Sequence, residues 1–261
     1  MDYFTMLSPK SEYNEDYYSS ALAKKLKGGD APIDDASYFV FDITSELTQF
    51  IYVSKYNITG GTVTVDWGDG TVETSSNISP EALSHKYRES GLYTVKITGD
   101  DGKLWSPGGG FYESSVIKNY SFLGDVSGKS PSYPTLISAV MGANSTLDNT
   151  RNFAFSTGLK SAVISDKSEA RKLTGYCFRN CSALEIVTLS NKISTIGEYA
   201  FLGCNSLHEL ILLNPVPPYI GSDASIYGLP DNCLIKVPAG SVEAYKTASV
   251  WSTRSNYIQA I

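Results

Sequence analysis

Two aspartates and a histidine are the first side chains in this sequence whose types and spacing could do chemistry. Asp66 and Asp69 lie close together in a glycine-rich stretch, and such a pair of carboxylates could act in acid–base catalysis or bind calcium. In a tight turn, both would instead accept hydrogen bonds from backbone N–H groups. We expect this bracing role, with calcium binding as the first alternative and catalysis after it. We expect His85 to pack near Tyr87 rather than to act as an acid or base.

The four cysteines are the second reactive group. Zinc bound by Cys177 and Cys181 would need two further ligands. The residues that remain for this are Cys204, Cys233, His85 and His208. Four cysteines are too few for a disulfide scaffold in a chain of this length, and two of them recur at the period of a repeat, where a cysteine is a small packing residue. We therefore expect free, buried thiols and no metal site.

Other signs of catalysis are weak. The two histidines are far apart in the sequence, which leaves little for a nucleophile and its base. Residues 128–130 (GKS) resemble the end of a phosphate-binding loop, but Leu123 stands where that loop needs a glycine. We expect no enzyme, no catalytic residue and no cofactor.

Charge and hydropathy narrow the range of partners. A net charge of -6 and a pI near 5.0 disfavour binding to nucleic acid phosphates. No apolar run approaches the length of about 20 residues that a membrane helix needs, and Met1 is followed by an acidic residue rather than by an export leader. The 18 tyrosines would suit a recognition surface, although strand positions also favour tyrosine.

A recurrence at 23 residues indicates the elements that position these side chains. Phe178, Cys181, Leu184 and Val187 return as Phe201, Cys204, Leu207 and Leu210, and residues 136–141 (LISAVM) return as 159–164 (LKSAVI). At least four stacked coils are therefore visible, each burying the apolar face that its neighbour leaves open. We expect one short strand per coil, at 138–141, 161–165, 186–190 and 209–213, paired in parallel. Such stacks are typical of binding proteins.

Two further segments precede the repeats. Residues 11–27 predict a short helix, because Tyr13, Tyr17, Leu22 and Leu26 share one stripe and the charges follow the helix dipole. This stripe either packs on its own domain or docks into a partner, and the four residues are our candidate docking site. Residues 37–104 alternate with period two and predict an antiparallel sheet with a hairpin at residues 69–70 (DG).

Both halves of the chain resemble known families. Residues 65–71 (VDWGDGT), 85–87 (HKY) and 91–95 (GLYTV) resemble a polycystic kidney disease (PKD) domain, which is an immunoglobulin-like β-sandwich. Residues 175–184 (GYCFRNCSAL) and 196–207 (IGEYAFLGCNSL) resemble the BspA-type leucine-rich repeat. Residues 214–218 (NPVPP), 237–246 (VPAGSVEAYK) and 258–261 (IQAI) are similar to the closing unit of that family, in which Val242, Tyr245 and Trp251 on a final helix would cover the last coil.

These observations predict a mainly β protein with short helices and four parts. They are an N-terminal helix and linker (1–36), an immunoglobulin-like β-sandwich (37–104), a short leucine-rich-repeat solenoid that begins with irregular coils (105–213), and a C-terminal cap (214–261). The two resemblances imply a non-enzymatic structural or recognition protein. We expect a phage virion component such as a tail, fibre or capsid decoration, exposed on the virion.

A bacterial surface or secreted adhesin that binds host glycan or protein is the alternative, and an accessory module of a secreted enzyme is an alternative of another class. The expected partners are virion or surface-assembly proteins within a homo-oligomer or larger assembly, with host glycan or protein as a further candidate. Neither nucleic acid nor membrane insertion is expected.

Overall fold

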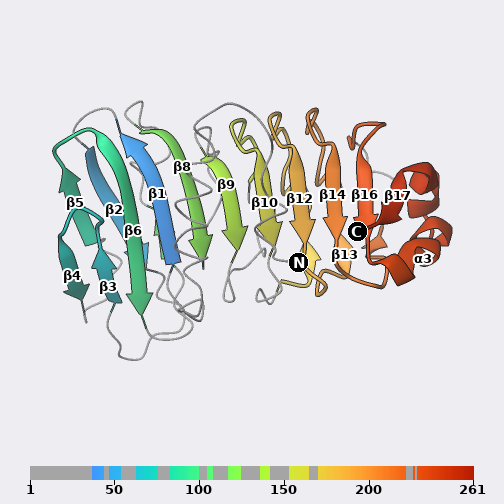
Figure 1. Ribbon diagram of the computed structural model, residues 1–261, viewed down its shortest axis with the longest axis horizontal. Helices are drawn as coiled ribbons and strands as arrows, with labels where there is room; N and C mark the ends of the chain where they lie inside the picture. Colours follow the sequence, from blue (N-terminus) through green and yellow to red (C-terminus); the bar gives the residue numbers. More distant parts are fainter. Residues whose placement is uncertain are drawn as a thin grey trace. The chain divides into compact units, whose positions relative to one another are not determined.

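The computed structural model describes residues 37–43, 47–53, 63–75, 83–99, 105–107, 117–124, 136–141, 153–164, 170–221, 226 and 228–261 (Figure 1). The predicted N-terminal helix and linker, with Tyr13, Tyr17, Leu22 and Leu26, lie outside these residues. The chain divides into two compact units, Met1–Gly124 and Asp125–Ile261. The fold is mainly β with a few short helices, as the sequence predicts.

The first unit contains two antiparallel sheets. One sheet has the strand order β8-β1-β6-β3-β4. Its strands are β1 (Ser37–Ile43), β3 (Val63–Asp66), β4 (Val72–Ser75), β6 (Gly91–Gly99) and β8 (Ile117–Gly124). Neighbouring strands pair in antiparallel registers throughout. The alternating pattern therefore correctly predicts antiparallel sheet in this part of the chain.

The other sheet of the first unit has three strands. They are β2 (Leu47–Val53), β5 (Leu83–Tyr87) and β7 (Trp105–Pro107), in the order β5-β2-β7. Because β7 pairs with β2 and β8 pairs with β1, both strands belong to the first unit. The expectation that irregular coils of the repeat begin at residue 105 is wrong for these two strands: their backbone groups complete the sheets of the preceding unit.

A parallel sheet organises the second unit, and Figure 1 shows its strands drawn side by side. The strands are β9 (Leu136–Met141), β10 (Ser161–Ile164), β12 (Ile186–Leu189), β14 (Glu209–Leu212), β16 (Leu234–Val237) and β17 (Ile258–Ala260). Ser161 pairs with Ser138 and with Ile186, and Ile186 pairs with Glu209. This is the register that the intervals of the sequence repeat predict.

A second parallel ladder runs through the same coils. Its two-residue strands are β11 (Lys172–Leu173), β13 (Thr195–Ile196) and β15 (Tyr219–Ile220). In each strand the second residue is buried and the first is exposed or half-exposed. The buried residues therefore contribute to the apolar interior. Two-residue strands have no detectable period of their own, and the sequence analysis did not foresee them.

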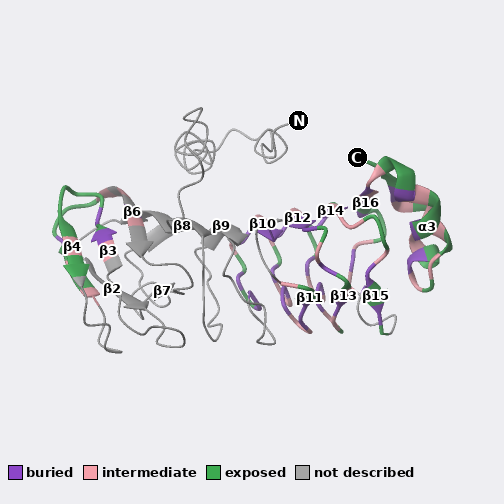
Figure 2. Ribbon diagram, turned by 90° about the horizontal axis from the view of Figure 1, so that it is seen from below, coloured by how far each residue is buried: buried purple, intermediate pink, exposed green. Residues whose placement is uncertain are grey.

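The interior of the second unit is built from equivalent side chains in successive coils. Phe178 and Phe201 are both fully buried, which confirms the expectation from the repeat. Buried positions run along β10, β12 and β14, and exposed positions are frequent on the C-terminal helices (Figure 2). Burying such a ring stabilises the folded chain by roughly 1.5–3 kcal/mol relative to leaving it in water.

The C-terminal segment closes the second unit with a short helix, α3 (Val242–Thr247), and a 3-10 helix, η4 (Trp251–Tyr257). Tyr245 and Trp251 are buried and contact each other edge to face at 5.6 Å, as expected of a cap. The two residues do not share one helix, because α3 ends at the extended residue Ala248 and Val250, with a φ of 68°, precedes η4. Val242 is half-buried, and β16 and β17 extend the parallel sheet beyond the last predicted strand.

Candidate functional site

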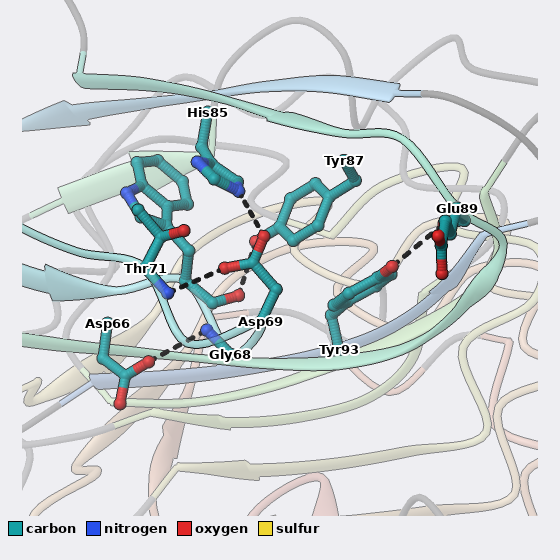
Figure 3. Close-up of polar contacts among 9 residues, drawn as sticks. Asp66, Gly68, Asp69, Thr71, His85, Tyr87, Glu89 and Tyr93 are labelled. Carbon is teal, nitrogen blue, oxygen red and sulfur yellow. Dashed lines mark hydrogen bonds and ion pairs between the residues drawn. The ribbon is translucent and has the colours of Figure 1, made fainter.

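The candidate carboxylates of the first unit brace a turn. Asp66 Oδ1 accepts a hydrogen bond from Gly68 N at 2.9 Å, and Asp69 Oδ1 accepts one from Thr71 N at 3.0 Å (Figure 3). Because Gly68 and Gly70 have φ values of 83° and 94°, the turn between β3 and β4 uses a backbone conformation that glycine tolerates. The bracing role that the sequence predicts for both aspartates is confirmed.

His85 lies against this turn and packs on aromatic rings. Its ring stacks on Trp67 at 5.0 Å and meets Tyr87 edge to face at 4.7 Å, so the expected packing near Tyr87 is confirmed. The sequence analysis missed its polar partner: His85 Nε2 lies 2.7 Å from Asp69 Oδ2. The second carboxylate oxygen thus links the turn to β5, while Tyr87 donates to Trp67 O at 2.7 Å (Figure 3).

The electrostatics of this cluster suit a structural role. Burial alone would raise the pKa of Asp69, but hydrogen bonds from His85 and Thr71 outweigh it and lower the pKa below its usual value. Burial raises the pKa of Tyr87, with a further contribution from the nearby Asp69 charge. Asp69 therefore stays ionised as an acceptor and Tyr87 stays protonated as a donor. Within the described ranges, no three histidine, cysteine or acidic side chains come together as metal ligands.

The cysteines of the second unit are packing residues. All four are free and buried, as expected. Cys181 Sγ donates to Phe153 O at 2.9 Å, and Cys204 Sγ donates to Phe178 O at 3.0 Å. Each of these two thiols thus bonds to the backbone of the preceding coil. Burial raises the pKa of Cys204 to about 12, so this sulfur remains a thiol rather than the thiolate that a nucleophile or metal ligand requires.

The phenylalanines at the repeat period form a continuous stack. Phe153, Phe178 and Phe201 stack nearly parallel, with centroid distances of 5.3 and 5.9 Å. Backbone hydrogen bonds tie the same coils together, from Phe153 N to Cys177 O at 2.8 Å and from Phe178 N to Ala200 O at 2.8 Å. A stack with such regular spacing is a rigid support for the side chains that point outward from the same turns.

The outward side of these turns carries a row of aromatic rings and one cation. We call Phe155, Tyr176, Arg179 and Tyr199 the turn row. Tyr176 stacks on Tyr199 at 5.4 Å, and the guanidinium carbon of Arg179 lies 5.5 Å from the ring centre of Tyr176 and 5.7 Å from that of Phe155. The sequence analysis missed this row, although the tyrosine two residues before Phe178 and before Phe201 was a signal for it.

The comparison with known protein families agrees with the repeat architecture. Residues 137–224 match the family described as BspA type leucine rich repeat region, in 6 copies. The match confirms the BspA-type repeats that the sequence analysis identified. It covers about a third of the chain and includes the phenylalanine stack and the turn row. Repeats of this type indicate a surface or protein-binding module.

No curated protein matches the chain at a significant level. None of the helices in the described part of the chain has the length and apolar composition required to cross a bilayer.

Proposed function

We propose that this chain is a non-enzymatic recognition protein whose repeat unit presents a binding surface to another macromolecule. The observation that carries the proposal is the stack of BspA-type coils, in which one rigid interior supports rows of outward side chains. A stacked repeat of this kind builds an extended surface that a single small domain does not offer. The braced turn of the first unit supports the same proposal. The carboxylate of Asp69 holds the turn between β3 and β4 against β5, which is a structural role rather than a catalytic one.

We further propose that the first unit is an immunoglobulin-like sandwich of the PKD type. Its two antiparallel sheets and the buried Trp67 and Tyr87 support this assignment, as does the resemblance of residues 65–71 and 85–87 to that family. In such a module the domain acts as a spacer that carries the binding unit. The proposed setting is an exposed phage virion component, such as a tail, fibre or capsid decoration, which acts within a larger assembly.

The proposed setting is tested by purifying particles and cells separately and locating the chain by mass spectrometry. Copurification with virions at constant stoichiometry is the expected result. Recovery from the bacterial envelope in the absence of particles would refute the virion setting and favour the surface adhesin. Recovery in a complex with a secreted hydrolase would refute both and favour an accessory module.

The docking role of Tyr13, Tyr17, Leu22 and Leu26 has its own experiment. We expect a chain lacking residues 1–27 to keep the circular dichroism spectrum of both units but to lose attachment to its assembly. A matched control replaces the four residues with serine in the full-length chain, which leaves the length unchanged. Normal incorporation of both variants would contradict the docking role.

A further inference from the structure

The turn row holds a cation between aromatic rings. The guanidinium of Arg179 lies within cation–π distance of both Phe155 and Tyr176, and Tyr176 stacks on Tyr199 in the next coil. Three consecutive coils therefore each contribute to one continuous set of contacts. The row is independent of the phenylalanine stack, whose rings are buried.

The backbone fixes the rings of this row in place. Phe155, Tyr176 and Tyr199 have φ values of 66°, 60° and 54°, a region that bulky residues rarely adopt. Such conformations persist only where the surrounding structure determines them. Here the neighbouring coils do so, through hydrogen bonds from Phe155 N to Arg179 O at 2.7 Å and from Tyr176 N to Glu198 O at 2.9 Å. The row is therefore preorganised before any partner arrives.

Arg179 has no anionic partner within the described part of the chain. Its Nε is buried and makes no hydrogen bond there, and none of the ion pairs in that part of the chain includes it. The residue as a whole is half-exposed, so part of its surface is open to a partner. An anion bound to this guanidinium would therefore supply the charge partner that the described part of the chain does not.

We propose that the turn row is a docking site for a glutamate or aspartate side chain of an acidic segment in a partner protein. The planar fork of a guanidinium matches a carboxylate with two parallel hydrogen bonds. Phe155, which is 44% exposed, adds apolar contact beside the ion pair. Tyrosine and arginine held in a rigid surface are also the residues that dominate the binding energy of protein interfaces.

The contacts within the row favour a protein over an acidic sugar. Sugars bind aromatic residues by stacking on a free ring face, whereas Tyr176 already contacts both Tyr199 and Arg179. The rings therefore act as side walls for Arg179 more than as an open platform. This inference rests on the proposed recognition function and names the chemistry of the partner.

The test uses the full-length chain and three probes. They are a short fluorescein-labelled peptide in which glutamate alternates with serine, the same peptide with glutamine in place of glutamate, and fluorescein-labelled oligogalacturonate. We expect the glutamate peptide to bind, the glutamine peptide to bind at least about tenfold more weakly, and Arg179→Gln to weaken binding of the glutamate peptide by about tenfold or more. Arg171→Gln, which removes an exposed arginine outside the row, should leave binding unchanged.

A second readout separates binding from folding. In a chain with ¹⁵N-labelled arginine, the Nε–H resonance of Arg179 is identified by its absence in Arg179→Lys, and it should shift when the glutamate peptide is added. Equal binding by wild type and Arg179→Gln, or no binding of the peptide by wild type, would overturn the proposal. Arg179-dependent binding of oligogalacturonate without binding of the peptide would overturn it in favour of an acidic glycan. A chain that binds the peptide through Arg179 but attaches to no particle or cell would refute the proposed virion setting and leave this site standing.

Discussion

Replacement of Gly197 by alanine should separate two coils of the repeat unit. A Cβ atom at this position would lie 2.4 Å from Gly175 N, 2.8 Å from Thr174 C and 2.9 Å from Gly175 Cα. Because the ordinary distance between carbon atoms in contact is at least about 3.5 Å, the coils must move apart by about 1 Å. All three atoms belong to the backbone, so no side-chain rotation can relieve the clash.

The expected cost follows from the contacts that this movement disturbs. Overpacking costs about 1–3 kcal/mol. The movement also strains the hydrogen bonds from Gly197 N to Leu173 O at 2.8 Å and from Tyr176 N to Glu198 O at 2.9 Å, each worth about 0.5–1.5 kcal/mol. We therefore expect the free energy of unfolding to fall by about 2–6 kcal/mol and the Tm to fall by at least about 4 °C.

Urea denaturation and hydrogen exchange measure this effect and locate it. Peptides from residues 193–201 should lose protection, while those from residues 63–75 in the first unit should not change. Gly240→Ala is the matched control, because a Cβ there meets no atom within 4 Å, and it should be neutral or stabilising by at most about 1 kcal/mol. If Gly197→Ala unfolds at the same urea concentration as Gly240→Ala, the close approach of the coils is not as described.

Three further substitutions test the thiols and the braced turn. Burial raises the pKa of Cys204 from 9.0 to about 12, so this thiol ionises at lower pH in the unfolded chain than in the folded chain. The free energy of unfolding should therefore fall as the pH rises from about 9 to about 12. Urea titrations should show a shallower fall for Cys204→Ala. Cys181→Asp buries an unpaired charge and should cost about 3–5 kcal/mol in the same assay, whereas unchanged melting would place this residue outside the core. Asp69→Asn removes the negative charge that lies 2.7 Å from His85 Nε2 and should cost about 0.2–1 kcal/mol near neutral pH. The pKa of Asp69 is lowered from 3.8 in the folded chain. The wild-type chain should therefore have a higher free energy of unfolding than Asp69→Asn above pH 3.8, and this difference should disappear as the pH falls through the folded pKa. Acid titration by near-UV circular dichroism checks this.

The sequence predicted most of the repeat unit because period and burial are linked. A side chain that returns every 23 or 25 residues at the same place in a coil must be apolar to fill the interior, so Phe178, Phe201, Cys181 and Cys204 were visible as core residues. Their spacing also fixed the register of the parallel strands. The outward residues follow no such requirement, and for that reason the turn row was missed.

The boundary between the two units was harder to predict for a different reason. Strands β7 and β8 complete sheets whose other members lie far earlier in the sequence. Pairing between distant segments leaves no local signal beyond the alternation of a few residues, and serine, glycine and proline around them favoured coil. The contact between His85 and Asp69 was missed on the same grounds, since it depends on how β5 lies beside the turn.

The repeat architecture divides the positions of each coil into two kinds. The inward positions are tied to their neighbours above and below, as the bond from Cys204 to Phe178 O shows, so a change at one of them disturbs two coils. The outward positions of the same turns are held in fixed conformations by that interior but carry little of its packing energy. Phe155, Tyr176 and Arg179 can therefore differ from coil to coil at low cost to stability. A surface of this kind separates folding from recognition, so Arg179→Gln should change binding far more than it changes melting, whereas Gly197→Ala should do the reverse.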